Sequence, residues 1–160
     1  AYWKGFKEFK AFGRPQGLPR LFGWQAAGAA PMVDGAVVKN PETIATAIRI
    51  GNPASWKQAE AALAESNGFI GKRTDDQILE AYRMLSTSEG IFAEPASCIS
   101  VAGLKEAYEA GKIEKGARVV CVLTGNGLKD PDTAIKYANM SDVIDDDYNA
   151  IEAAVLKGLK

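Results

Sequence analysis

Arg118-Val119-Val120-Cys121-Val122-Leu123 is the stretch of the sequence that decides the fold. Every residue after Arg118 is apolar and most are β-branched, which favours an extended strand over a helix. A strand that is apolar on both faces is typical of a parallel sheet covered by helices on both sides. We therefore predict a strand over residues 118–123 in such a sheet.

The segments around this strand have the patterns of further strands and of helices. Short strands are predicted over residues 20–25, 69–72 and 91–92. Helices are predicted over residues 2–12, 56–66, 75–87, 95–110 and 148–159, with another beginning at Asp130-Pro131. Strands that alternate with helices of this length indicate an α/β fold, here a three-layer parallel sheet flanked by helices.

Length and charge limit the function. With 160 residues the chain is one domain or a large piece of one. Its formal net charge is −1 and it has no long block of one sign, whereas nucleic acids and anionic membranes need a concentrated basic face. No apolar run approaches the roughly 20 residues of a membrane span. We expect a small-molecule ligand, with neither nucleic acid nor membrane as a partner.

Histidine is missing from the whole sequence. Its absence excludes Ser-His-Asp and Cys-His catalysis and removes the commonest metal ligand, so we assign no metal site. Cys98 and Cys121 lie in apolar stretches without metal-type spacing. We expect both to be buried free thiols in a reducing cytoplasm.

The segment that follows the decisive strand is the candidate binding loop. Parallel sheets bind ligands at the carboxyl ends of their strands, and here Thr124 leaves the strand with a free hydroxyl. Gly125 and Gly127 allow sharp turns and close approach of a ligand. The pattern alone is explained more simply by a helix-capping loop with no ligand. A dinucleotide fingerprint is disfavoured, because its third glycine position is Asp130.

Several other residues have a functional and a structural interpretation. Arg49 could bind a carboxylate or a phosphate, although a structural ion pair is the commoner role. Glu94 and Ser97 begin a helix and are both explained as caps. The aromatic residues of the opening helix are expected in the core rather than at a cofactor. The small residues 26–30 suggest that two backbones, or a backbone and a flat ligand, approach closely.

Taken together and in order, several stretches resemble the threonine synthase family. They are residues 1–6 (AYWKGF), 17–20 (GLPR), 25–31 (QAAGAAP), 41–56 (PETIATAIRIGNPASW), 89–97 (EGIFAEPAS) and 122–131 (VLTGNGLKDP). From about Asp132 onward the resemblance is weakest.

This resemblance implies a pyridoxal-phosphate enzyme of fold type II, similar to the large domain of the tryptophan synthase β-like fold. It implies conversion of O-phospho-L-homoserine and water into L-threonine and phosphate, by a lyase that is cytoplasmic and homodimeric. Thr124 matches the hydroxyl that faces the pyridine nitrogen of the cofactor in this family. Ala47 matches a position against the cofactor ring, where a larger side chain would collide.

The resemblance also implies what residues 1–160 do not contain. They match the carboxyl-terminal part of the large cofactor-binding domain. The Schiff-base lysine and the Gly/Asn-rich phosphate loop of the family lie upstream, so we expect no catalytic lysine in this chain and no activity from it alone. Two alternatives stay open: a threonine or serine dehydratase of the same fold, or a catalytically dead structural fragment.

Overall fold

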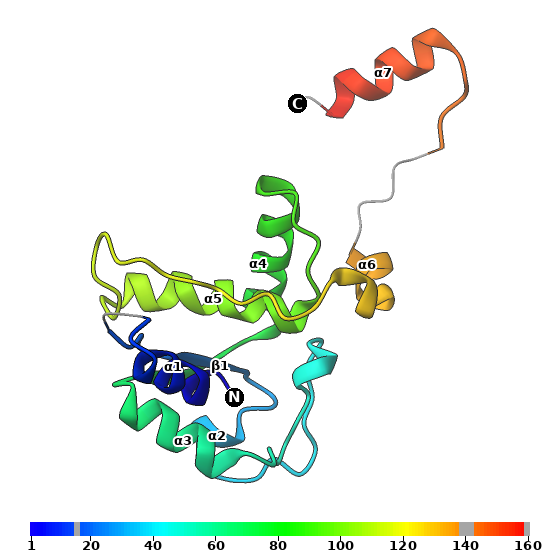
Figure 1. Cartoon of the computed structure of the whole chain (residues 1–160). Coiled ribbons are helices and arrows are strands. Elements are labelled where there is room, and N and C mark those ends of the chain that lie inside the picture. The colour runs from blue at the N-terminus through cyan, green and yellow to red at the C-terminus, as the bar shows by residue number, and fades with distance from the viewer. Residues whose placement is uncertain (15–16, 138–142, 159–160) are drawn as a thin grey trace.

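The computed structural model describes residues 1–14, 17–137 and 143–158. Strands β1 (Phe22–Ala26) and β2 (Phe69–Arg73) form a parallel pair in which Phe22 lies opposite Phe69 and Ala26 opposite Arg73. Figure 1 shows α5 on one side of this pair and α1, α2 and α3 toward the other. The predicted α/β class, with a parallel sheet between helices, is confirmed.

The longer helices agree with the predicted segments to within a few residues. They are α1 (Tyr2–Ala11), α3 (Trp56–Glu65), α4 (Asp75–Ser88), α5 (Pro95–Glu109), α6 (Pro131–Tyr137) and α7 (Tyr148–Gly158). The structure also contains the short helix α2 (Pro31–Asp34) and the 3₁₀ helices η1 (Thr46–Ile48) and η2 (Gly127–Lys129), which the sequence did not predict. The predicted end of the last helix at Leu159 lies outside the described residues. Within the described ranges, no helix is long and apolar enough to cross a membrane.

A capping box starts α4. The backbone amide of Gln77 donates to the Thr74 hydroxyl (3.3 Å), and the Gln77 side chain accepts from the Thr74 amide (3.0 Å). Two amides that the helix leaves without partners are thereby satisfied. Ser55, in contrast, occupies the N-cap position of α3 without forming a side-chain cap.

The core lies where α4 and α5 pack on each other and on the sheet. Helix α4 contributes Ile78, Ala81, Tyr82 and Leu85, and α5 contributes Ala96, Cys98, Ile99 and Ala102. The side chain of Trp24, on β1, packs against this cluster from the sheet. Gly103 allows the contact, because a Cβ at this position would overlap the indole ring of Trp24.

The strand predicted over residues 118–123 does not form. Val119, Val120 and Val122 are 44%, 83% and 46% exposed, and residues 118–123 make no main-chain hydrogen bond with other described residues. A strand requires a neighbour, and within the described part of the chain β1 pairs only with β2. The β-branched pattern therefore predicted a strand that is wrong, because the segment has no neighbouring strand to pair with among the described residues.

The short strand predicted over residues 91–92 is also wrong. The backbone there has no regular structure, and the nearest pairing is an isolated bridge between Ala93 and Asn126. Two residues are too few for a ladder, so the main chain passes directly from the end of α4 to the start of α5.

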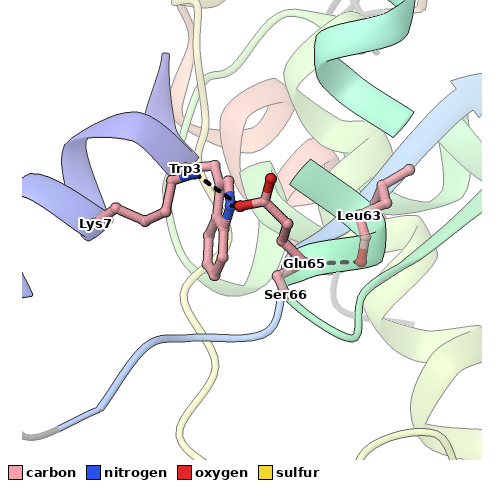
Figure 2. A network of polar contacts seen from close by, with 5 residues as sticks. All are labelled: Trp3, Lys7, Leu63, Glu65 and Ser66. Atoms are coloured by element: carbon pink, nitrogen blue, oxygen red, sulfur yellow. Dashed lines mark hydrogen bonds and ion pairs between the residues drawn. The ribbon is translucent and has the colours of Figure 1, made fainter. Parts of the chain in front are cut away.

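Helix α1 contacts the rest of the chain chiefly through Trp3. This side chain is 8% exposed, whereas the other aromatic residues of the 2–12 segment, Tyr2, Phe6, Phe9 and Phe12, are exposed. The prediction of a core aromatic set therefore holds for Trp3 alone. In Figure 2 the Trp3 indole and the Lys7 ammonium donate to one Glu65 oxygen, each at 2.7 Å. The hydrogen bond from Lys7, followed by that from Trp3, lowers the pKa of Glu65.

Replacing Gly103 should destabilise the chain. In Gly103→Ala the new methyl group overlaps Trp24, and overpacking of this kind costs about 1–3 kcal/mol. Gly5→Ala is the matched control. Gly5 lies in α1, and nothing lies within 4 Å of a Cβ added at this position. Alanine moreover favours a helix over glycine by up to about 1 kcal/mol. Urea unfolding should show a lower midpoint for the first variant and an equal or higher one for the second. Equal midpoints for Gly103→Ala and the wild type would contradict the packing of Trp24.

The contribution of Glu65 to stability should depend on pH. Because folding lowers its pKa from the ordinary 4.5, the ionised carboxylate stabilises the fold above pH 4.5, and this contribution is lost as the pH falls through the folded-state pKa. The melting temperatures of wild type and Glu65→Gln should therefore differ at pH 7 and converge in acid. Glu114→Gln is the control, since Glu114 makes no side-chain hydrogen bond or ion pair with described residues. A difference that stays constant with pH would exclude the proposed electrostatic origin.

Candidate functional site

The loop that contains Thr124 is fastened to the first turn of α5. The amide of Gly125 donates to the Ser97 hydroxyl at 2.7 Å, and the carbonyl of Gly125 accepts from the amide of Glu94 at 3.1 Å. These two bonds fix the backbone on both sides of the Gly125 α-carbon. The exposed Thr124 side chain is therefore presented from a rigid position.

A direct contact joins the two hydroxyls of this region. The Oγ atom of Ser97 lies 3.1 Å from Oγ1 of Thr124 and 3.2 Å from the Gly125 carbonyl oxygen. Ser97 is only 1% exposed, while Thr124 is open to solvent. One hydroxyl is thus enclosed by protein and the other faces outward.

Glu94 is buried beside the same loop. It occupies the N-cap position of α5 and is 5% exposed, yet its side chain makes no capping hydrogen bond. Its carboxylate instead lies against Gly125, where any Cβ would overlap it. The predicted position of Glu94 as the cap of α5 is therefore confirmed, although its side chain forms no capping hydrogen bond. Ser97 likewise does more than begin a helix, since its hydroxyl binds the 124–125 backbone.

Ala47 lies on η1, and its methyl group is exposed. The loop that carries it is fixed from within by Asp75, whose carboxylate accepts from the Thr43 hydroxyl (2.5 Å) and the Ile44 amide (3.0 Å). The guanidinium of Arg49 donates to the Thr43 carbonyl. Of its two predicted roles Arg49 therefore has a structural one, although its partner is a backbone carbonyl and not a carboxylate.

Asp130 connects the two loops. Its carboxylate accepts from the Thr46 hydroxyl at 3.3 Å and from the Thr133 amide at 3.2 Å. One side chain thus caps α6 and holds η1 against the end of the 124–130 loop. The residues predicted from the resemblance, Thr124 and Ala47, lie on loops that share this connection.

The small residues 26–30 bring two backbones together. The Glu42 amide donates to the Gly28 carbonyl at 3.0 Å, and a Cβ on Gly28 would overlap the carbonyl oxygen of Glu42. Ala26, Ala29 and Ala30 are fully or almost fully buried beside this contact. Of the two explanations for these small residues, close approach of two backbones is the one observed.

Neither cysteine has the properties of a nucleophile. Burial, followed by the nearby charge of Glu94, raises the pKa of Cys98 to about 11. Burial also raises the pKa of the Cys121 thiol, which is only half-buried rather than buried as predicted. Both are free thiols and are protonated at neutral pH. In the described part of the chain, moreover, no three acidic or cysteine side chains gather as a metal site would require.

Comparison with known proteins identifies the family. The sequence profile described as "Pyridoxal-phosphate dependent enzyme" matches residues 1–125, which include η1 and end within the 124–130 loop. The chain belongs to this family. Its α/β fold and the cofactor expected from the sequence agree with that membership.

Curated relatives of the chain carry the name threonine synthase. The protein from Halalkalibacterium halodurans is 56% identical over 90% of this chain and 40% of its own length. The protein from Synechocystis sp. is 57% identical over 85% of this chain and 35% of its own length. The protein from Methanocaldococcus jannaschii is 47% identical over 99% of this chain and 41% of its own length. The resemblance to threonine synthases is confirmed, and the chain spans about 40% of the length of these relatives.

Among solved structures, a threonine deaminase from T.th. superposes on 66% of this chain and 39% of its own, with a TM-score of 0.46 and 21% identity.

Three of the residues that shape the site have no such role predicted from the sequence. Ser97 and Asp75 lie in the first turns of helices, where local capping already explains a polar residue, and their contacts to distant loops leave no local signal. For Asp130 the sequence indicates only that a helix begins there and that the segment does not match a dinucleotide-binding fingerprint.

Removing the Asp130 carboxylate should loosen both loops. Asp130→Ala loses the cap of α6, which costs about 1 kcal/mol, and also the bond to Thr46. Thr46→Ala should therefore lower the free energy of unfolding in the wild type, where it removes that bond, and lower it little further in the Asp130→Ala background. A double-mutant cycle followed by urea unfolding measures this non-additivity. Asp132→Ala is the control, because Asp132 is exposed in the first turn of the same helix. Fully additive losses would mean that Thr46 and Asp130 are not coupled.

Proposed function

We propose that this chain is the part of a threonine synthase that contacts the pyridine ring of pyridoxal phosphate. The observation that carries the proposal is the identity of 47–57% with threonine synthases over most of this chain. A second supporting observation is the Thr-Gly-Asn-Gly loop, residues 124–127, which hydrogen bonds from the start of α5 hold in place. The longer protein would be a lyase that converts O-phospho-L-homoserine and water into L-threonine and phosphate.

Two features of the loops support the proposed contact with the cofactor ring. A pyridine nitrogen needs one hydrogen-bond partner, and the exposed Thr124 hydroxyl has capacity left after its contact with Ser97. A flat ring also needs a small neighbour beside its face, and the exposed methyl group of Ala47 provides one. Both positions belong to backbone segments fixed by internal hydrogen bonds, which supports a preformed site.

Pyridoxal phosphate, when bound, supplies the electron sink for chemistry at the substrate's carbon atoms. Thr124 would orient the ring and donate to its nitrogen. Because a hydroxyl is neutral, it does not hold a proton on that nitrogen as a carboxylate would, so the sink is tempered and side reactions are restrained. Ala47 would leave space for the ring.

The remaining groups of the reaction would lie outside this chain. The Schiff-base lysine and the loop for the cofactor phosphate are expected in the part of the relatives that the chain does not match, so the chain alone should be inactive. The homodimer, the cytoplasmic location and the placement of residues 1–160 in the large domain stay predictions.

The proposal is tested in a full-length protein. A chimera in which this chain replaces the matching region of the Halalkalibacterium halodurans relative should bind pyridoxal phosphate and release phosphate from O-phosphohomoserine faster than it consumes threonine. The opposite preference would support the dehydratase alternative. A chimera that folds and binds no pyridoxal phosphate would refute the proposal.

Thr124→Val in this chimera should weaken cofactor binding. The change keeps the shape of the side chain and removes one hydrogen bond, which corresponds to an increase of about 2- to 12-fold in the dissociation constant of pyridoxal phosphate. Fluorescence titration measures this constant. Leu128→Ala is the control, because Leu128 is exposed in the same loop and has no assigned role. Equal constants for Thr124→Val and the parent would remove Thr124 from the site.

A further inference from the structure

The Ser97 hydroxyl has few ways to use its proton. A serine hydroxyl carries one donor hydrogen and two acceptor lone pairs. The Gly125 amide already donates to Ser97 Oγ at 2.7 Å, which occupies one lone pair. Since the residue is 1% exposed, its hydrogen must go to a protein group, and two acceptors are in range: Thr124 Oγ1 at 3.1 Å and the Gly125 carbonyl at 3.2 Å.

Of these two acceptors, Thr124 Oγ1 is the one that receives no hydrogen bond from another described residue. The carbonyl of Gly125 already accepts from the Glu94 amide at 3.1 Å, whereas Thr124 Oγ1 has no other donor among the described residues. When Ser97 donates to Thr124, the Thr124 hydrogen cannot point back at Ser97. It is directed outward, toward the open side of the loop.

We infer that Ser97 is a positioning residue that sets the direction of the Thr124 hydrogen bond to the cofactor. This inference rests on the proposed contact between Thr124 and the pyridine nitrogen. With Ser97 as its donor, Thr124 donates to the ring and therefore requires a free lone pair on the ring nitrogen, which keeps that nitrogen unprotonated. Without Ser97, Thr124 can turn and accept a hydrogen bond from a protonated ring nitrogen.

A purely structural role for Ser97 predicts a different result. If its hydroxyl only fastens the Gly125 turn, its removal lowers stability and leaves protonation of the ring unchanged. Protonation of the ring nitrogen, rather than activity or stability, is therefore the property to measure. Ser100→Ala is a matched control, because Ser100 lies on the same helix and its hydroxyl donates to the Ser97 carbonyl (2.9 Å) within α5.

The test uses the full-length chimera loaded with pyridoxal phosphate that is ¹⁵N-labelled in the ring. The ¹⁵N chemical shift is followed against pH in the parent, Ser97→Ala, Thr124→Val, the double variant and Ser100→Ala. Ser97→Ala should raise the pH at which the ring nitrogen becomes protonated and increase the dissociation constant of pyridoxal phosphate by about 2- to 10-fold. The double variant should titrate like Thr124→Val alone, and Ser100→Ala like the parent.

Two negative results separate this inference from the proposed function. If Thr124→Val changes the ring titration and Ser97→Ala does not, Ser97 has no positioning role and the Thr124 contact stands. If Thr124→Val leaves both the titration and the dissociation constant unchanged, the Thr124 contact fails and the inference falls with it.

Should Ser97→Ala not fold, Ser97→Cys takes its place, because a thiol is a weak donor. Its titration should move in the same direction, and a titration identical to the parent would overturn the inference.

Discussion

Burial of the first half of α5 is the constraint on which the other contacts depend. Its first turns are enclosed by α4 and the sheet, so that Pro95, Ala96, Ser97, Cys98 and Ile99 are all buried. Because this segment cannot shift without opening the core, the groups at its amino end become fixed points for the chain that passes over them. The Gly125 turn uses two of these groups, the Ser97 hydroxyl and the Glu94 amide.

The candidate site is built from loops, yet hydrogen bonds to buried side chains make those loops rigid. Asp75 and Asp130 each hold a segment distant in sequence, and each also sits in or next to the first turn of a helix. A carboxylate at such a position is stabilised by the helix dipole and still has lone pairs for a second segment. Acidic residues at the starts of helices thus also hold the segments that carry Thr124 and Ala47.

The sequence was sufficient for most of the elements and for the family, and insufficient for the long-range contacts. Periodicity and capping signals identified α4 and α5 because these signals are local. Residues 118–123 show the limit of such reasoning: a β-branched run predicts extended backbone, but sheet formation depends on a partner that the run does not encode. For the same reason the side chains of Ser97, Asp75 and Asp130 could not be assigned their distant partners. The proposed roles of Thr124 and Ala47 toward a ligand came from family resemblance, since an exposed threonine and an exposed alanine have no distinguishing pattern.

The contact between Trp24 and Gly103 has a consequence for how this chain can diverge. The indole fills the space that any side chain at position 103 would occupy, so a larger residue there becomes acceptable only after Trp24 has been replaced by a smaller one. The reverse order forces a clash, and the smaller residue alone leaves a cavity in the core, which also carries a penalty. The two positions, far apart in the gene, are thus expected to change together in evolution, and homologues should carry either both residues or neither.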